Sequence, residues 1–119
     1  MHGNLFGGFM MQYLDEAGAS FAMRTCRSSK MVTKFIANVS FDRPVHVGDI
    51  VKIYGEVKSV GTTSITIDLV AKRADTYTTS EETVCSTSMT FVRIAKNGKS
   101  REIDSSVRYH FEVLGKSKS

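Results

Sequence analysis

The segment from residue 9 to about residue 27 is a predicted helix that is apolar on nearly every side. Met10, Leu14, Ala17 and Phe21 recur at helical spacing. Further apolar residues widen this surface: Met11, Tyr13, Ala19, Ala22 and Met23. A helix that is hydrophobic all round is stable only when other elements cover it. The rest of the chain is therefore expected to fold around this helix.

The chain beyond this helix has the two-residue period of β-strands. Predicted strands cover residues 31–41, 50–60, 62–71 and 83–94. Pro44 and Gly48 separate the first two strands, and Asn97 and Gly98 form a turn signal after the last. Residues 105–115 fit either a strand or a helix. One buried helix followed by long antiparallel strands predicts an α+β fold in which a curved sheet wraps around the helix. Open strand edges in such a sheet favour pairing with a second copy.

Size and composition are those of one globular domain. The chain has 119 residues, of which 41% are hydrophobic and 24% charged. The sequence shows neither an apolar run of membrane-spanning length nor a signal-peptide pattern, so we expect a cytoplasmic protein that does not enter a membrane. Cys26 and Cys85 lack CxxC spacing and are expected to be buried free thiols.

The basic residues are concentrated near the C-terminus. The net charge is +4, and from Lys96 onward there are six cations and three anions. This excess suits an anionic partner such as a phosphorylated cofactor, or a solvated basic tail. Nucleic acid is not expected as a partner, because the tail lacks interleaved basic and aromatic residues.

Asp15 is the candidate catalytic residue. No metal site is expected, because His2, His46 and His110 lack ligand spacing. Asp15 lies in a helix interior, where aspartate is a poor structural choice. Its small and apolar neighbours on the helix leave room for a substrate. Alternatively, Asp15 and Glu16 share a solvated edge of the helix.

The adjacent glycines before the helix are the second candidate. Gly7 and Gly8 predict a tight turn whose free N–H groups, at a helix N-terminus, could stabilise an oxyanion. A plain turn without a catalytic role is the alternative. Gly8 and Asp15 are about 10 Å apart along one helix at roughly 1.5 Å per residue. Two antiparallel copies could bring both groups to one carbon atom, which predicts a site shared between subunits.

Several short motifs along the chain form a specific set. The N-terminal motif is Gly3-Asn4-Leu5-Phe6-Gly7-Gly8, followed by Met11 and Asp15-Glu16-Ala17-Gly18. Later motifs are Phe41, Arg43-Pro44-Val45, Val47-Gly48-Asp49 and Gly61-Thr62-Thr63-Ser64. Together they resemble the motifs of hot-dog acyl-CoA thioesterases of the cytosolic acyl-CoA hydrolase type, and the resemblance spans residues 3 to about 101. It implies a double-hot-dog dimer with sheets joined edge to edge, often as a hexameric trimer of dimers.

The resemblance implies hydrolysis of acyl-CoA to a free acid and CoA, with no metal or other cofactor. Asp15 takes the position of the carboxylate that activates water or attacks the thioester, and Gly7 and Gly8 that of the oxyanion donors. Substrate-lining positions fall on Phe6, Thr63 and Ser64, the last two from a neighbouring subunit. Candidates for the CoA phosphates, chosen mainly by charge, are Lys72, Arg73 and Arg101.

The domain boundaries and two alternative functions complete the sequence-based predictions. Residues 1–104 are expected to form the hot-dog domain and residues 105–119 a basic tail. The resemblance implies a further strand with an Asn before the first motif, and we expect that strand to be missing or truncated here. The alternative function is a non-catalytic acyl-CoA-binding or regulatory module. A hydratase or dehydratase is disfavoured, because no His is placed to share proton transfer with Asp15.

Overall fold

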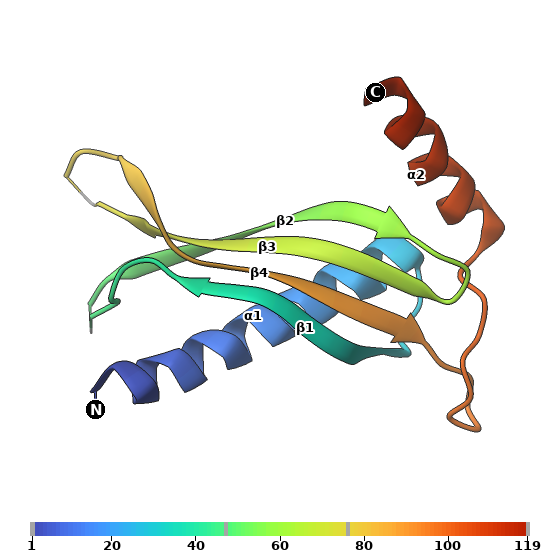
Figure 1. Ribbon diagram of the computed structural model, residues 1–119, viewed down its shortest axis with the longest axis horizontal. Helices are drawn as coiled ribbons and strands as arrows, with labels where there is room; N and C mark the ends of the chain where they lie inside the picture. The colour runs from blue at the N-terminus through green and yellow to red at the C-terminus, as the bar shows by residue number, and fades with distance from the viewer. Residues whose placement is uncertain (1, 47, 76, 119) are drawn as a thin grey trace.

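The computed structural model describes residues 2–46, 48–75 and 77–118, and within these ranges the side chains of residues 8–111. Figure 1 shows a helix, four strands and a second helix in chain order. Their bounds are α1 His2–Cys26, β1 Met31–Phe41, β2 Ile50–Val60, β3 Ser64–Ala74, β4 Glu81–Arg93 and α2 Ser105–Lys118. The four predicted strands are confirmed.

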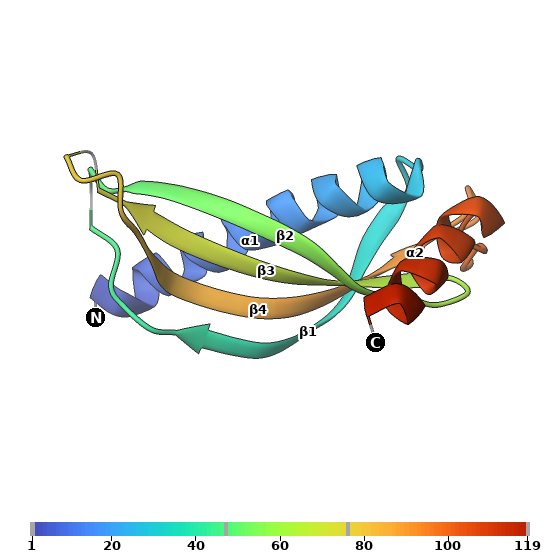
Figure 2. The same cartoon turned by 90° about the horizontal axis from the view of Figure 1, so that it is seen from above.

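The strands form one antiparallel sheet in the order β1-β4-β3-β2, so β1 and β2 are its edges. Helix α1 crosses one face of this sheet, and α2 stands at the end of the sheet at which β4 finishes, beside the end of β2 (Figures 1 and 2). The predicted α+β arrangement of a curved sheet around a helix is confirmed.

The core lies between α1 and the sheet. Strand β3 alternates from Ser64 to Ala71, where every second residue is buried. Its buried residues are Ile65, Ile67, Leu69 and Ala71, and those of α1 are Met10, Leu14, Gly18, Ala22 and Cys26. The helical residues recur every four positions and so form one stripe, which packs on the sheet.

Helix α1 packs unusually close to the sheet at Gly18. A Cβ atom at this position would lie 2.8 Å from Cζ of Phe91 and 2.9 Å from Cδ1 of Leu69. Only a residue without a side chain fits there, which sets the distance between α1 and the strands beneath it.

The side of α1 that faces away from the sheet is not covered. Phe9 is 51% and Tyr13 59% exposed. The prediction that α1 is buried all round is therefore wrong for the single chain, because a four-stranded sheet covers only one side of a helix.

Residues 105–118 form helix α2, which decides between the strand and the helix that the sequence allowed there. Asp104 precedes its first residue and accepts hydrogen bonds from the backbone N–H of Ser106 at 3.0 Å and from its hydroxyl at 2.9 Å. This is an N-cap, and the backbone N–H is the main reason that the pKa of Asp104 is lowered. Val107 is buried, and Phe111 packs against the core. The first part of α2 therefore packs on the hot-dog domain predicted for residues 1–104.

Cys26 and Cys85 are buried and unpaired, as predicted, and burial raises the pKa of both thiols. Among the described residues, no helix has the length and apolar character needed to cross a membrane.

Candidate active site

Asp15 lies where α1 passes over the edge strand β1. Its side chain is half-buried, and its Oδ1 accepts a hydrogen bond of 2.6 Å from the Thr33 hydroxyl. The neighbouring Glu16 is exposed and accepts a hydrogen bond of 3.4 Å from Gln12 Nε2. The alternative interpretation, in which Asp15 and Glu16 share a solvated edge of the helix, therefore holds for Glu16 but not for Asp15.

Thr33, the hydrogen-bond partner of Asp15, is a candidate site residue that the sequence analysis missed. It pairs in register with Phe91, whose side chain packs under α1, so Thr33 lies on the same face of the sheet. The register of β1 shifts between Thr33 and Phe35, which places a bulge beside the contact with Asp15. The available signal was an inward-facing hydroxyl in β1, but threonine is so common in strands that the signal is weak.

The tight turn predicted at Gly7 and Gly8 is wrong. Helix α1 begins at His2, so both glycines lie within it. Only the first four N–H groups of a helix lack an intrahelical acceptor, and here they belong to residues 2–5. Later N–H groups point at the carbonyl four residues earlier, which leaves Gly7 and Gly8 without free donors in this backbone. The helical spacing of Phe6, Met10 and Leu14 continues through the glycines, which permit a turn but do not require one. The Phe6 side chain lies outside the described part of the molecule.

Thr63, Ser64 and Arg101 gather at the end of the sheet where β3 begins. The Arg93 N–H donates to the Thr63 carbonyl at 2.9 Å, and the Arg101 N–H donates to the Arg93 carbonyl at 2.8 Å. Ser64 alternates with the buried Ile65, so it lies on the face of β3 that points away from α1. The single chain therefore does not bring these residues to Asp15, which is on the α1 side.

Lys72 and Arg73 lie near the opposite end of β3. Eight positions from Ser64 to Lys72 correspond to about 26 Å at roughly 3.3 Å per residue. Arg73 forms ion pairs with Glu82 and, at 3.7 Å, with Asp49. The Lys72 ammonium lies 5.5 Å from the ring centroid of Tyr54. Within one chain, Arg73 is already engaged by carboxylates, and neither cation is near Arg101.

Two cavities lie near the start of β2, and neither contains Asp15. One of about 380 Å³ separates α1 from β2. Its apolar walls are Met10, Tyr13, Val45, Val51 and Ile53. The other, of about 440 Å³, is more polar and contains Arg73 together with Asp49, Asp75 and Glu82. In the described residues no cluster of His, Cys, Asp or Glu has the geometry of a metal site.

Comparison with known families decides what kind of protein this is. The family model of the thioesterase superfamily matches residues 2–80. The chain belongs to the thioesterase superfamily. Asp15, Thr33 and the Gly7–Gly8 pair all lie within the matched range.

Relatives of known sequence agree with this family. An uncharacterized acyl-CoA thioester hydrolase of Haemophilus influenzae is 34% identical over 105 residues, which are 86% of this chain and 68% of the relative. The acyl-CoA thioester hydrolase YciA of Escherichia coli is 37% identical over 68 residues, covering 57% of this chain and 51% of YciA.

Solved structures of similar proteins establish the fold as a hot dog. The hexameric broad specificity acyl-coenzyme A thioesterase HI0827 superposes with a TM-score of 0.80 at 30% identity, covering 94% of this chain and 77% of HI0827. The hexameric hotdog fold thioesterase Cj0915 of Campylobacter jejuni gives a TM-score of 0.78 at 31% identity, covering 87% and 80%. The hot-dog prediction is confirmed.

Proposed function

We propose that the chain hydrolyses acyl-CoA thioesters to a carboxylic acid and CoA, and that Asp15 is the residue acting at the thioester carbonyl. The relatives named above are acyl-CoA thioester hydrolases and thioesterases. The single observation that carries the role of Asp15 is its half-buried carboxylate, held by Thr33 at 2.6 Å. Among the described hydrogen bonds, this is the one by which a side chain of α1 is joined to a side chain of the sheet.

The carboxylate of Asp15 can act through the oxygen that Thr33 does not bind. As a general base, it takes a proton from water while the water oxygen bonds to the thioester carbon. As a nucleophile, it forms an anhydride with the acyl group, which water then hydrolyses. Both routes break the carbon–sulfur bond, release CoA as a thiol and need no metal ion. Dialysis against a chelator is therefore expected to leave the rate unchanged.

Two copies are proposed to join through the edge strand β1. Its pairing edge is open, and five of its large apolar side chains are exposed: Val32, Phe35, Ile36, Val39 and Phe41. Exposed apolar surface of this kind typically marks an interface. HI0827 and Cj0915 are hexameric. A partner at β1 would cover the contact between Asp15 and Thr33 from the open side, and could supply the substrate-lining residues that one chain keeps away from it.

The test of this function is the pair of variants Asp15→Asn and Glu16→Gln. Asn keeps the shape of Asp but cannot take a proton or attack, so kcat for acyl-CoA hydrolysis should fall by roughly 10² to 10⁴. KM should change little, because the loss is confined to the transition state. Glu16→Gln removes an exposed carboxylate one position away and should have a mild effect. Hydrolysis that survives Asp15→Asn but is abolished by Glu16→Gln would refute the assignment.

A further inference from the structure

The edge strand β1 contains two β-bulges. One lies between Thr33 and Phe35, where β1 has one residue, Lys34, more than the neighbouring strand β4. The other lies between Ala37 and Ser40, where β1 again has one residue more than β4. A bulge interrupts the alternation of a strand, so the residues between the two bulges face the opposite sides from those that a regular strand would give them.

The second bulge is held by contacts within the chain. Asn38 has a φ of 56°, in the left-handed region that asparagine enters more easily than most residues. The hydroxyl of the buried Thr87 donates a hydrogen bond of 2.9 Å to the carbonyl of Ala37, directly before Asn38. This bulge is therefore formed before any partner binds.

The pairing with β4 defines which side of the sheet each residue of β1 faces. Met89, Phe91 and Cys85 of β4 lie in the core under α1. Their opposite residues in β1 face α1, and the residues next to these face outward. Facing α1 are Met31, Thr33, Ile36, Val39 and Phe41, and facing outward are Val32, Phe35, Ala37 and Ser40.

The two bulges are symmetric about Ile36. Lys34 lies two positions before Ile36, and Asn38 lies two positions after it. The strand itself, Met31–Phe41, has 11 residues and is centred on Ile36. Two antiparallel copies of β1, related by a two-fold axis at Ile36, therefore meet bulge to bulge and pair along their whole length.

In this register, each residue lies opposite one that faces the same side. On the α1 side, Thr33 lies opposite Val39 of the partner subunit. On the outer side, the large Phe35 lies opposite the small Ala37 of the partner subunit. Moving the axis to Phe35 would instead place Thr33, which faces α1, opposite the outward Ala37.

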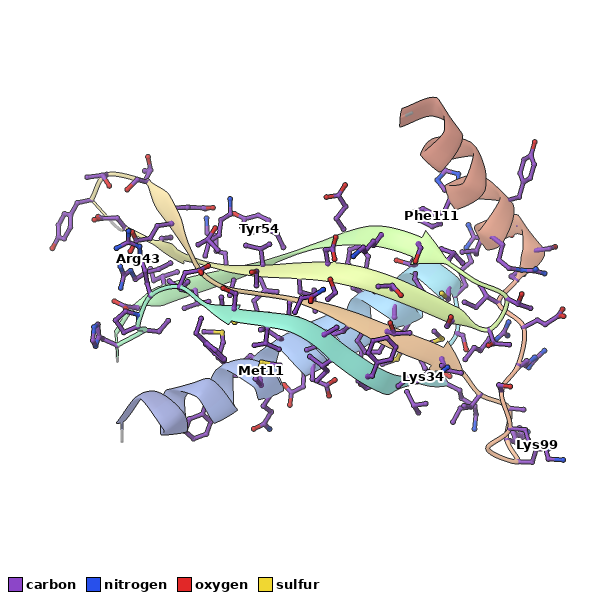
Figure 3. All side chains as sticks on the ribbon, viewed as in Figure 1. Met11, Lys34, Arg43, Tyr54, Lys99 and Phe111 are labelled. Carbon is purple, nitrogen blue, oxygen red and sulfur yellow. The ribbon has the colours of Figure 1, made fainter. Side chains whose placement is uncertain are left out.

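Lys34 is the one charged residue of β1. Figure 3 shows it at the lower border of the molecule, where β1 is the outermost strand. Lysine side chains and bulges on an edge strand hinder its pairing with other strands. With the axis at Ile36, Lys34 lies opposite Asn38 of the partner subunit, so like charges do not meet. The edge is therefore suited to a second copy of itself and poorly suited to an unrelated, regular strand.

Apolar residues on the α1 side of β1 lack a cover in the single chain. Ile36, Val39 and Phe41 face α1, yet they are 41%, 42% and 53% exposed. A second copy in this register brings these residues of both chains together around the axis. The pairing would thus remove apolar surface from water, which favours association.

We propose that two copies pair through β1 in this one register, with the axis at Ile36, and that Val39 of the partner subunit borders the contact between Asp15 and Thr33. The inference rests on the proposed function, which joins two copies at β1 and assigns the chemistry to Asp15. Directly opposite residues have Cα atoms about 4.5 to 5.5 Å apart, so Val39 of the partner subunit lies beside Thr33. An apolar side chain there excludes water from the hydrogen bond that positions Asp15, and such a bond is stronger in surroundings of low dielectric constant.

Cysteine cross-linking tests the register. Ile36→Cys places two thiols directly opposite each other, within the Cα separation of about 4.4 to 6.8 Å that a disulfide spans. In Phe35→Cys, the matched control, the Cα atoms of the two cysteines are diagonal neighbours about 7 to 8 Å apart. With a mild oxidant, we expect Ile36→Cys to form a disulfide dimer at least about tenfold faster than Phe35→Cys. Co-expressed Phe35→Cys and Ala37→Cys chains should form a mixed dimer. Cys26 and Cys85 are each 1% exposed, so the wild-type protein should not cross-link.

The outcomes separate the register from the catalytic function. Equal rates for Ile36→Cys and Phe35→Cys, or no disulfide dimer from either folded variant, would overturn the register. The oxidised Ile36→Cys dimer should keep kcat within about twofold of the reduced protein, because the bond locks the active arrangement. A loss of activity on oxidation that a reductant reverses would also overturn the proposal. Cross-linking of Ile36→Cys in a protein whose wild type hydrolyses no acyl-CoA would support the register and refute the proposed function.

Mixed dimers test whether Val39 acts at the site of the other subunit. Asp15→Asn chains and Val39→Asp chains are co-expressed, both carrying Ile36→Cys so that the disulfide holds the pair. Val39→Asp alone puts a second carboxylate beside Asp15 and should lower kcat at least about tenfold. In a mixed dimer, one of the two sites has both Asp15 and Val39 intact. About half of the dimers are mixed, so kcat should return to about one quarter of the wild-type value. An unchanged kcat in Val39→Asp, or no recovery in the mixed dimers, would overturn the role of Val39.

Discussion

Replacing Gly18 by alanine tests whether the close approach of α1 to the sheet is real. The new Cβ would lie 2.8 Å from Cζ of Phe91 and 2.9 Å from Cδ1 of Leu69, where ordinary contacts begin at 3.4 Å. Phe91 is 0% and Leu69 1% exposed, so neither side chain can move into solvent. Overpacking of this kind costs about 1 to 3 kcal/mol. The higher helix propensity of alanine offsets about 1 kcal/mol of that cost.

Gly8→Ala is the matched control, because it is the same substitution in the same helix. A Cβ at Gly8 meets no atom within 4 Å, so only the gain in helix propensity remains. Urea unfolding of both variants at equal protein concentration should show Gly18→Ala less stable than Gly8→Ala by about 1 to 3 kcal/mol, which is the overpacking cost alone. Because Gly18 is one helical turn from Asp15, the displaced helix should also lower kcat. A Gly18→Ala protein as stable as Gly8→Ala would refute the packing described here.

Three further outcomes are expected. Thr33→Val removes the hydroxyl that holds Asp15 and should lower kcat by about tenfold or more with little change in KM. Thr33→Ser keeps a hydroxyl and should keep kcat near the wild-type value. An unchanged kcat in Thr33→Val would show that the hydrogen bond does not position Asp15. Gly8→Ala should leave turnover intact because Gly8 is helical. A large loss of kcat would indicate that this segment forms a turn whose N–H groups stabilise the oxyanion. The pKa of Asp104 is lowered from 3.8 by its cap hydrogen bonds, so its contribution to stability is complete above that value and is lost as pH falls through the lower folded pKa. Asp104→Asn caps α2 without a charge and should flatten the acid limb of a pH series of thermal melts; an unchanged limb would exclude this cap as its source.

Local sequence decided neither the conformation of the glycines nor the positions of the cations. Gly7 and Gly8 permit both a turn and a helix, and local sequence does not decide between them when the apolar spacing of Phe6 and Met10 continues across the pair. The grouping of Arg73 with Arg101 was based on charge, but charge carries no position. The structure separates them along β3, and pairs Arg73 with Glu82 and Asp49.

The sequence alone determined the order of the first helix and the four strands, and with it the α+β class, because the two-residue period of β3 and the helical spacing of Met10, Leu14, Ala17 and Phe21 distinguish a strand from a helix. Which side of α1 is buried was decided only by its packing on the sheet. The sequence also singled out Asp15, since a carboxylate is out of place on such a helix. Its partner Thr33 was decided only by tertiary structure. Eighteen positions separate the two in the chain, and their contact depends on the angle at which α1 crosses the sheet and on the bulge in β1. These are set by packing across many residues, which no local pattern encodes.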